Sequence, residues 1–313
     1  MAKTNPNIDA TDIVQDSPVL RALPEPLRPY ARLARLDRAI GTWLLLLPTW
    51  WGLSLAWIGH PALPLPSPWY FLLFGVGALV MRGAGCTWND ITDRDYDGRV
   101  ARTATRPIPA GEVSVKMAVL FMVAQSLLGL LILLQFNWET VIVGIASLLL
   151  VAAYPFMKRI TYWPQAWLGL TFNWGALVGW SSMQPGIAAP ALVLYAAGFF
   201  WTLGYDTIYA HQDKEDDALI GVKSTALKLG DSTKQWLWGF YGIAILLIGV
   251  AGWLAAAGWA FWPILAVAAA HLVRQILTAK LDDPANCLAH FKSNRDFGFI
   301  ILAAIIAGGI TTG

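Results

Sequence analysis

Two stretches of this chain carry acidic residues at helical spacing, a pattern that suits a divalent-metal site. They run over residues 89–97 and 206–217, and within each the acids are separated by three, four or seven positions. Side chains spaced in this way share one face of a helix. Hard cations such as Mg²⁺ take oxygen ligands and complete their shell with water and substrate phosphates. The residues that the spacing groups are Asn89, Asp90, Asp93 and Asp97 in the first stretch and Asp206, Asp213 and Asp217, with Asp216 beside them, in the second.

Carboxylates grouped on one face repel each other, and inside a membrane each costs about 2.5–3.5 kcal/mol at the centre of a helix. A bound cation makes such a group tolerable. A single acidic residue at a helix end is ordinarily just solvated. Two clusters with related spacing instead favour a site in which Mg²⁺ ions hold a diphosphate between them.

Basic residues lie near both acidic stretches and could bind the phosphate oxygens. An arginine guanidinium binds phosphate through paired hydrogen bonds, whereas a lysine ammonium acts as a point charge. The candidates are Arg102, Arg106, Lys158, Arg159 and Lys223. The alternative is that their positive charge only orients the chain in a membrane.

The composition predicts the kind of element that positions these groups. Of the 313 residues, 57% are hydrophobic and 13% charged, against about 45–50% and about 25% in a soluble domain. This excludes a disordered chain, a coiled coil and an ordinary soluble enzyme. The net charge of only +2 argues against nucleic acid as a partner. The sequence therefore predicts an all-α polytopic protein embedded in a lipid bilayer.

Nine apolar runs are long enough to cross a hydrocarbon core of about 30 Å. We expect nine transmembrane helices around a central cavity, forming one domain over residues 38–313. Residues 1–37 should form a flexible segment and a short basic helix, over 27–36, on the membrane surface. The predicted spans lie near residues 39–59, 67–89, 113–135, 138–157, 165–183, 188–209, 236–257, 260–279 and 297–312.

The distribution of Lys and Arg predicts how these spans are oriented. Apart from Arg82, every Lys and Arg lies in the N-terminal segment, in alternate loops or in the last helical hairpin. The positive-inside rule then places the N-terminus in the cytoplasm and the C-terminus outside. The acidic N-terminal segment lacks the composition of an Arg-rich transit peptide. We therefore expect a multi-pass protein of the bacterial inner (plasma) membrane.

The motifs resemble those of the UbiA-type intramembrane prenyltransferases. Asn89-Asp90-x-x-Asp93-x-x-x-Asp97 is similar to the family's first motif, and Asp213-x-x-x-Asp217 is similar to its second. The likeness runs from about residue 30 to the end, with Ala39 standing where we would expect proline. Residues 102–111 and 221–226 also match the family, and residues 35–43 and 154–159 resemble its branch that uses 4-hydroxybenzoate.

The resemblance implies transfer of a polyprenyl group from polyprenyl diphosphate to 4-hydroxybenzoate, at the ring carbon ortho to the hydroxyl, in ubiquinone biosynthesis. The six acidic-motif residues would coordinate Mg²⁺. The residues implied to be catalytic are Asp90, Asp93, Asp213 and Arg159, and those implied to bind substrate are Arg38, Arg102, Arg106, Tyr154, Lys158, Tyr205 and Lys223.

Within that implied set, Arg38 is the candidate for the acceptor carboxylate, with an interfacial anchor as the alternative role. The tyrosines could shield an allylic cation by cation–π contact, or simply pack. Two other functions compete. One is a related prenyltransferase with a naphthoate, homogentisate or haem-type acceptor. The other is a cation-coupled transporter, which the gathering of acids on one side of the membrane disfavours.

Overall fold

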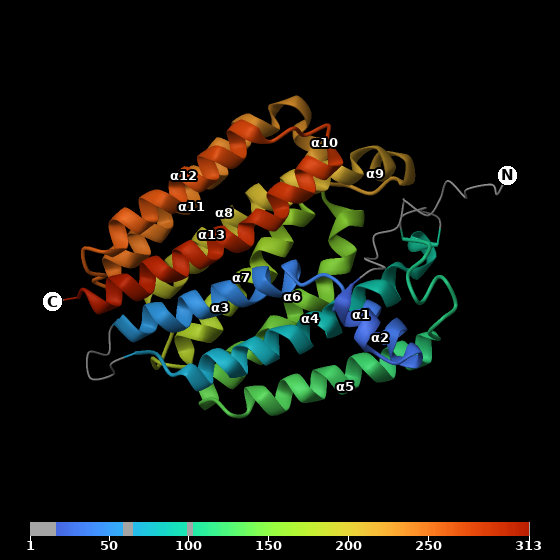
Figure 1. Cartoon of the computed structure of the whole chain (residues 1–313), viewed down its shortest axis with the longest axis horizontal. Helices are drawn as coiled ribbons and strands as arrows, with labels where there is room; N and C mark the ends of the chain where they lie inside the picture. The colour runs from blue at the N-terminus through green and yellow to red at the C-terminus, as the bar shows by residue number, and fades with distance from the viewer. Residues whose placement is uncertain (1–16, 59–64, 99–102, 313) are drawn as a thin grey trace. The chain divides into compact units, whose positions relative to one another are not determined.

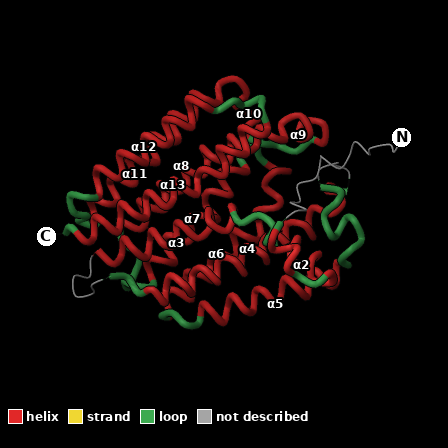
Figure 2. Tube along the Cα trace, viewed as in Figure 1, coloured by secondary structure: helices red, strands yellow, loops and turns green. Residues whose placement is uncertain are grey.

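The computed structural model describes residues 17–58, 65–98 and 103–312. The regular structure of these residues is entirely helical, with no strand among them (Figure 2). The all-α prediction is therefore confirmed. Arg102 and most of the predicted flexible start lie outside the described residues.

Long helices account for most of the described chain (Figure 1). They are α3 (Ile40–Ile58), α4 (Pro68–Asp97), α5 (Val115–Leu133), α6 (Trp138–Ile160), α7 (Pro164–Ser181), α8 (Ala189–Ala210), α11 (Thr233–Leu254), α12 (Phe261–Thr278) and α13 (Pro284–Ile310). Shorter helices are α1 (Pro18–Ala22), η2 (Glu25–Leu27), α2 (Arg28–Leu33), η3 (His211–Asp213), α9 (Lys214–Ile220), α10 (Thr225–Leu229) and η4 (Gly230–Ser232).

Seven helical segments of the described chain are long and apolar enough to cross a membrane. They contain α4, α5, α6, α8, α11, α12 and α13. The helices α3 and α7 are not among the seven, and both contain many Trp, Gly and polar residues between their aliphatic ones. A membrane protein with many crossings is thus supported, whereas nine crossings and the sides of the two termini stay predictions.

The chain divides into two compact units. Unit 1 comprises residues 1–42 and 76–132, and unit 2 comprises residues 43–75 and 133–313. The first acidic stretch belongs to unit 1 and the second to unit 2. The boundary expected at residue 37 separates a surface segment from a catalytic domain, and that distinction stays a prediction.

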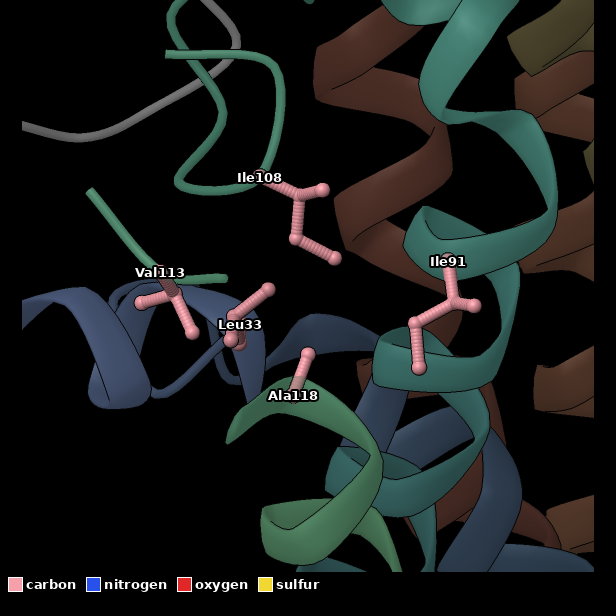
Figure 3. Close-up of a cluster of buried hydrophobic side chains, with 5 residues drawn as sticks. All are labelled: Leu33, Ile91, Ile108, Val113 and Ala118. Atoms are coloured by element: carbon pink, nitrogen blue, oxygen red, sulfur yellow. The ribbon is translucent and has the colours of Figure 1, made fainter. Parts of the chain in front are cut away.

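A small hydrophobic cluster holds unit 1 together around the first acidic stretch (Figure 3). Leu33 at the end of α2, Ile91 in α4 and Ala118 in α5 are buried in it with Ile108 and Val113 of the following loop. Burial of leucine, isoleucine and valine side chains stabilises by about 1.5–3 kcal/mol each. The cluster therefore fixes both α2 and the loop after residue 102 against the acidic end of α4.

In unit 2, glycines bring two helices into backbone contact. A Cβ atom added at Gly52 of α3 would collide with the carbonyl of Ala176 in α7, and one added at Gly179 of α7 would collide with the carbonyl of Thr49. Small residues at helix interfaces allow this close approach. In a bilayer the lipid is as apolar as the side chains, so helices associate through such close packing and not through the hydrophobic effect.

Indole groups provide directional contacts within unit 2. Trp51 of α3 donates to the carbonyl of Gly298 in α13 at 2.8 Å, and Trp201 of α8 donates to Asn294 at 2.8 Å. Trp174 of α7 donates to a carbonyl of α6 at the same distance. These three tryptophans therefore join neighbouring helices of unit 2.

Candidate functional site

The first acidic stretch is the last part of α4, which continues to Asp97 and so keeps the stretch helical. Asp90 and Asp93 are completely buried and Asp97 is 6% exposed. Arg94 and Asp95, which lie between them, are exposed. The helical spacing therefore places three carboxylates on the buried face of α4, while the charged residues between them point away.

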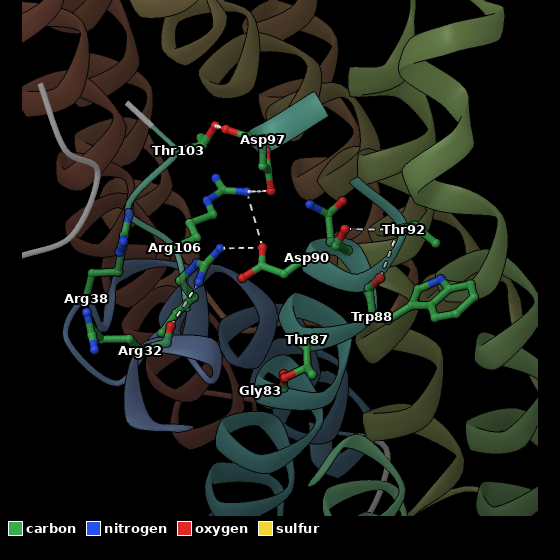
Figure 4. Close-up of polar contacts among 12 residues, drawn as sticks. Arg32, Arg38, Gly83, Thr87, Trp88, Asp90, Thr92, Asp97, Thr103 and Arg106 are labelled. Atoms are coloured by element: carbon green, nitrogen blue, oxygen red, sulfur yellow. Dashed lines mark hydrogen bonds and ion pairs between the residues drawn. The ribbon is translucent and has the colours of Figure 1, made fainter. Parts of the chain in front are cut away.

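Arg106 joins two of these carboxylates (Figure 4). Its Nη1 donates to Oδ2 of Asp97 at 2.8 Å and to Oδ1 of Asp90 at 3.2 Å. The sequence predicted that Arg106 lies near the first motif, and the structure brings them together. Asn89 lies on the same helical turn as Asp90 and is half-buried.

Arg35 is a second partner of Asp90 and was not among the predicted site residues. Its Nη2 donates to Oδ1 of Asp90 at 2.6 Å, and both side chains are buried. The other oxygen of Asp90, Oδ2, is also buried and has no hydrogen-bond partner among the described residues. One carboxylate oxygen thus accepts from two guanidiniums, while the second is left for another ligand.

Arg35 reaches Asp90 from an unusual backbone conformation. Helix α2 ends at Leu33, and Arg35 has a φ of 55°, in the left-handed region. Leu36 donates its N–H to the carbonyl of Ala31 at 2.9 Å, and Arg35 donates to the carbonyl of Arg32 at 3.1 Å. This is a Schellman helix end, in which the left-handed position is usually glycine.

Arg82 fastens the same turn to α4. Its Nη1 donates to the carbonyls of Arg35 and Arg38 at 3.3 and 3.4 Å. Gly41 leaves the space for it, since a Cβ atom there would collide with the Arg82 guanidinium. The sequence did carry a signal for this residue, because Arg82 is an arginine inside a predicted span and such residues are rarely without a role.

The predicted acceptor anchor, Arg38, lies in the same turn but not on the acidic stretch (Figure 4). Its Nε donates to Asp37 at 3.1 Å, and its side chain is 21% exposed. The neighbouring carboxylate keeps this guanidinium in place at the start of α3. Its role toward an acceptor stays a prediction.

In unit 2, the second acidic stretch follows α8. Asp213 ends η3 and Asp217 lies in α9, and both are half-buried. Helix α9 ends at Ile220, and the next residue, Gly221, has a φ of 75°, a left-handed conformation that suits glycine. This turn sends the chain into the loop that carries Lys223.

That loop brings together two predicted phosphate-binding residues. The backbone N–H of Lys223 donates to the carbonyl of Lys158 at 2.9 Å, and its Nζ donates to the carbonyl of Ile160 at 3.1 Å. Arg159 follows on α6 with its guanidinium 5.6 Å from the centre of the Phe156 ring. The basic end of α6 and the loop after α9 therefore form one cationic surface.

Thr225 fixes this loop to the neighbouring helices. Its N–H donates to Oε1 of Gln165 in α7 at 3.1 Å, and its hydroxyl is 2.8 Å from that of Thr207 in α8. All three side chains are buried. The matching stretch 221–226 thus serves to position Lys223.

The two predicted tyrosines have different surroundings. Tyr205 is fully buried, with ring centroids 4.9 Å from Trp201 and 5.7 Å from Phe291, and its hydroxyl accepts from Thr202 at 3.2 Å. Tyr154 is half-buried on α6, one turn before Lys158. Tyr205 is therefore part of a packed aromatic group, and a role for either tyrosine toward a substrate stays a prediction.

The donors of the first stretch fit a hard divalent cation chemically. They are carboxylate and amide oxygens, and the buried Oδ2 of Asp90 has no partner in the part of the chain that the structure describes. Hard cations prefer such ligands. Within the residues described, however, no three His, Cys, Asp or Glu side chains are already grouped closely enough to hold a metal ion.

Comparison with known proteins identifies the family. The model of the UbiA prenyltransferase family matches residues 45–302, which include both acidic stretches. The chain belongs to the UbiA prenyltransferase family. The resemblance inferred from the motifs is confirmed.

Named relatives of this UbiA-family chain are similar over most of its length. The mitochondrial 4-hydroxybenzoate polyprenyltransferase of Aedes aegypti is 50% identical over 286 residues, which cover 91% of this chain and 64% of the mosquito protein. The human protein of the same name is 50% identical over 302 residues, which cover 93% of this chain and 78% of the relative. The chain thus spans less than two thirds of the mosquito relative.

Solved structures share the UbiA fold with this chain. The apo structure of a UbiA homolog from Aeropyrum pernix K1 has a TM-score of 0.68 and 25% identity, covering 82% of this chain and 96% of that one. A UbiA homolog from Archaeoglobus fulgidus, bound to GPP and Mg²⁺, has a TM-score of 0.63 and 19% identity, covering 89% and 99%.

The expected location in a bacterial inner membrane is wrong. The relatives are named as mitochondrial proteins of animals and a plant, and they point to a mitochondrial membrane. Charge alternation along the chain distinguishes the two sides of a bilayer and carries no information about which membrane is crossed. The multi-pass part of the expectation is supported by the seven apolar helical segments.

Proposed function

We propose that this protein transfers a polyprenyl group from polyprenyl diphosphate to 4-hydroxybenzoate, at the carbon ortho to the hydroxyl, as a step of ubiquinone biosynthesis. The observation that carries the proposal is its identity of about 50% to proteins named for this reaction, over more than nine tenths of the chain. The catalytic part would be residues 38–313.

In this proposal, Asn89, Asp90, Asp93 and Asp97 of unit 1 are ligands of divalent metal, as are Asp213 and Asp217 of unit 2, and Mg²⁺ is the metal we propose. Mg²⁺ supplies neutralisation of the charge that develops on the leaving diphosphate. The burial of three carboxylates on one face of α4 supports this role, because oxygen ligands there are shielded from water.

The basic residues bind and orient the diphosphate. Arg106 is already held beside the acidic stretch, and Lys223 is held against the basic end of α6, where Lys158 and Arg159 lie. Arg102 follows the first motif in the sequence and is assigned the same role. Fixed positive charges of this kind stabilise a leaving group most when water is excluded.

In this proposal Arg38 binds the carboxylate of the acceptor, and Tyr154 and Tyr205 have the role of shielding the allylic cation by cation–π contact. Cleavage of the allylic C–O bond leaves a cation that must meet the acceptor ring before it meets water. An apolar site between membrane helices excludes water and holds the long prenyl tail.

A transfer assay tests this function. Purified protein in lipid is given a labelled prenyl diphosphate, with 4-hydroxybenzoate, a naphthoate or homogentisate as acceptor. We expect product with 4-hydroxybenzoate, loss of product in excess chelator, and recovery when Mg²⁺ is restored, because the diphosphate binds through the metal. Full turnover in chelator, or transfer to another acceptor instead, would contradict the proposal.

A further inference from the structure

Asp90 is shared by two guanidiniums on a single oxygen. Arg35 and Arg106 contact Oδ1 at 2.6 and 3.2 Å, and the Asp90 side chain is fully buried. Two fixed positive charges this close repel a cation that approaches the same carboxylate, and they do so strongly in a site shielded from water. A divalent metal at Asp90 must therefore compete with these arginines.

Arg35 is the closer of the two partners, and its backbone has a conformation that is usually found with glycine. Its side chain is 8% exposed, and its left-handed backbone at the end of α2 would suit glycine. A backbone conformation that costs free energy persists where the surrounding structure requires the residue. Here the ion pair of the guanidinium with Asp90, which is 55 residues away in the sequence, accounts for an arginine at this position.

Arg82 keeps Arg35 in that position. It holds the carbonyls of Arg35 and Arg38 from α4, the same helix that carries Asp90. The helix thus supplies both the carboxylate and the support for its counter-ion, which fixes the distance between them.

We propose that the ion pair of Arg35 with Asp90 weakens the binding of a divalent cation to this carboxylate, a function called the guard role below. The cation then binds tightly only together with an anion that pairs with the Arg35 guanidinium in place of Asp90. In the proposed function that anion is the diphosphate of the prenyl substrate, and the inference rests on that function because it takes Asp90 as a metal ligand. The guanidinium moves from carboxylate to phosphate oxygen while the cation takes the carboxylate. Metal and diphosphate then bind cooperatively, and each binds weakly alone.

Titration of Mn²⁺ alone into the full-length protein, followed by the EPR signal of the unbound ion, tests this role. We expect Arg35→Gly and Arg35→Gln to bind Mn²⁺ about tenfold more tightly than the wild type, with no diphosphate present. Glycine suits the left-handed backbone, so Arg35→Gly preserves the turn while it removes the charge.

Arg32→Gln is the matched control. It removes a guanidinium from the same helix end, but that guanidinium pairs with the partly exposed Glu112 and not with Asp90. Its affinity for Mn²⁺ should equal that of the wild type. The increase in Mn²⁺ affinity of Arg35→Gly should also disappear when Asp90→Asn is added, because the increase depends on that carboxylate.

Unchanged or weaker Mn²⁺ binding by both Arg35 variants would overturn the guard role, as would a gain that survives Asp90→Asn. The proposed function is judged separately by Mg²⁺-dependent prenyl transfer in the wild type. If the wild type transfers the prenyl group while the Arg35 variants show no gain, only the guard role fails. If the wild type transfers nothing, the function itself fails.

Discussion

At the scale of single residues, the acidic end of α4 separates buried from exposed carboxylates within one helical turn. Asp93 has no exposed surface, whereas its neighbour Asp95 is exposed. Such a contrast distinguishes a carboxylate placed for binding from one that is merely solvated, even though the two are alike in the sequence.

This contrast predicts the effect of two matched substitutions. Asp93→Asn keeps the size of the side chain but removes the charge needed as the diphosphate leaves, so kcat should fall by about 10²–10³. Asp95→Asn should leave kcat within a factor of about two, since exposed residues away from a site have small effects. Steady-state kinetics with both substrates measure this, and equal losses in the two variants would argue against a specific role for Asp93.

Arg38 gives a second prediction at this scale. If it holds the acceptor carboxylate equally in the ground and transition states, Arg38→Gln should raise the KM for 4-hydroxybenzoate and leave kcat nearly unchanged. The KM for the prenyl diphosphate should not move. A rise in the diphosphate KM with the acceptor KM unchanged would remove the anchor role from Arg38 without affecting the acidic residues.

At the scale of elements, hydropathy predicted where the helices lie better than where they end. The second predicted span stopped at residue 89, whereas α4 runs to Asp97, and the last one began at 297, whereas α13 begins at Pro284. Hydropathy identifies the part of a helix that lipid surrounds, and a helix can continue beyond it as a charged, partly buried extension. In α4, that extension carries the candidate site.

The site was predictable where it depended on spacing along one helix. Asp90, Asp93 and Asp97 share a face because the chain is helical there, and Arg106 follows nearby in the loop. Arg35 was not predictable in the same way. Its contact with Asp90 depends on a left-handed residue at the end of α2, and arginine carries no sequence signal for that conformation.

The glycine contact between α3 and α7 gives a prediction at this scale. Gly179→Ala should lower the stability of the protein by about 1–3 kcal/mol, because the added methyl group has only the backbone of α3 to displace. Gly239→Ala, at an exposed position of α11 with no atom within 4 Å, should be neutral or stabilise by up to about 1 kcal/mol.

Thermal unfolding of both glycine variants in detergent measures these effects. The midpoint should fall for Gly179→Ala and hold or rise for Gly239→Ala. Equal shifts in both variants would mean that the contact between α3 and α7 contributes nothing specific.

At the scale of the whole molecule, the arrangement of crossings is the property that most needs a direct measurement. In the described parts of the chain, seven helical segments have the length and hydropathy to cross, and nine crossings require that α3 and α7 cross as well. Both of these helices belong largely to unit 2 and are buried along much of their length. Helices covered by protein can cross a membrane with fewer aliphatic residues than helices that face lipid.

Nine crossings predict that residue 231 and the C-terminus lie on opposite sides of the membrane. Single-cysteine variants, Asp231→Cys and Thr312→Cys, in a chain whose Cys86 and Cys287 have been replaced by serine, would be labelled in sealed vesicles with a membrane-impermeant maleimide. We expect only one of the two to react until the vesicles are opened. Three crossings, in α11, α12 and α13, are predicted between residue 231 and the C-terminus. Reaction of both cysteines from the same side would contradict them.

Some tryptophans join helices in the interior and others lie on the surface, so their fluorescence should respond differently to quenchers. Trp51 and Trp201 have no exposed surface, and their ring centroids are 5.1 Å apart, whereas Trp138 and Trp259 are at least 70% exposed. Brominated lipids and aqueous iodide can quench the fluorescence of the second pair by contact but cannot reach the first. The emission that survives both quenchers therefore includes that of Trp51 and Trp201, and a change in its intensity reports on the packing of α3 against α8 when ligands or detergents change.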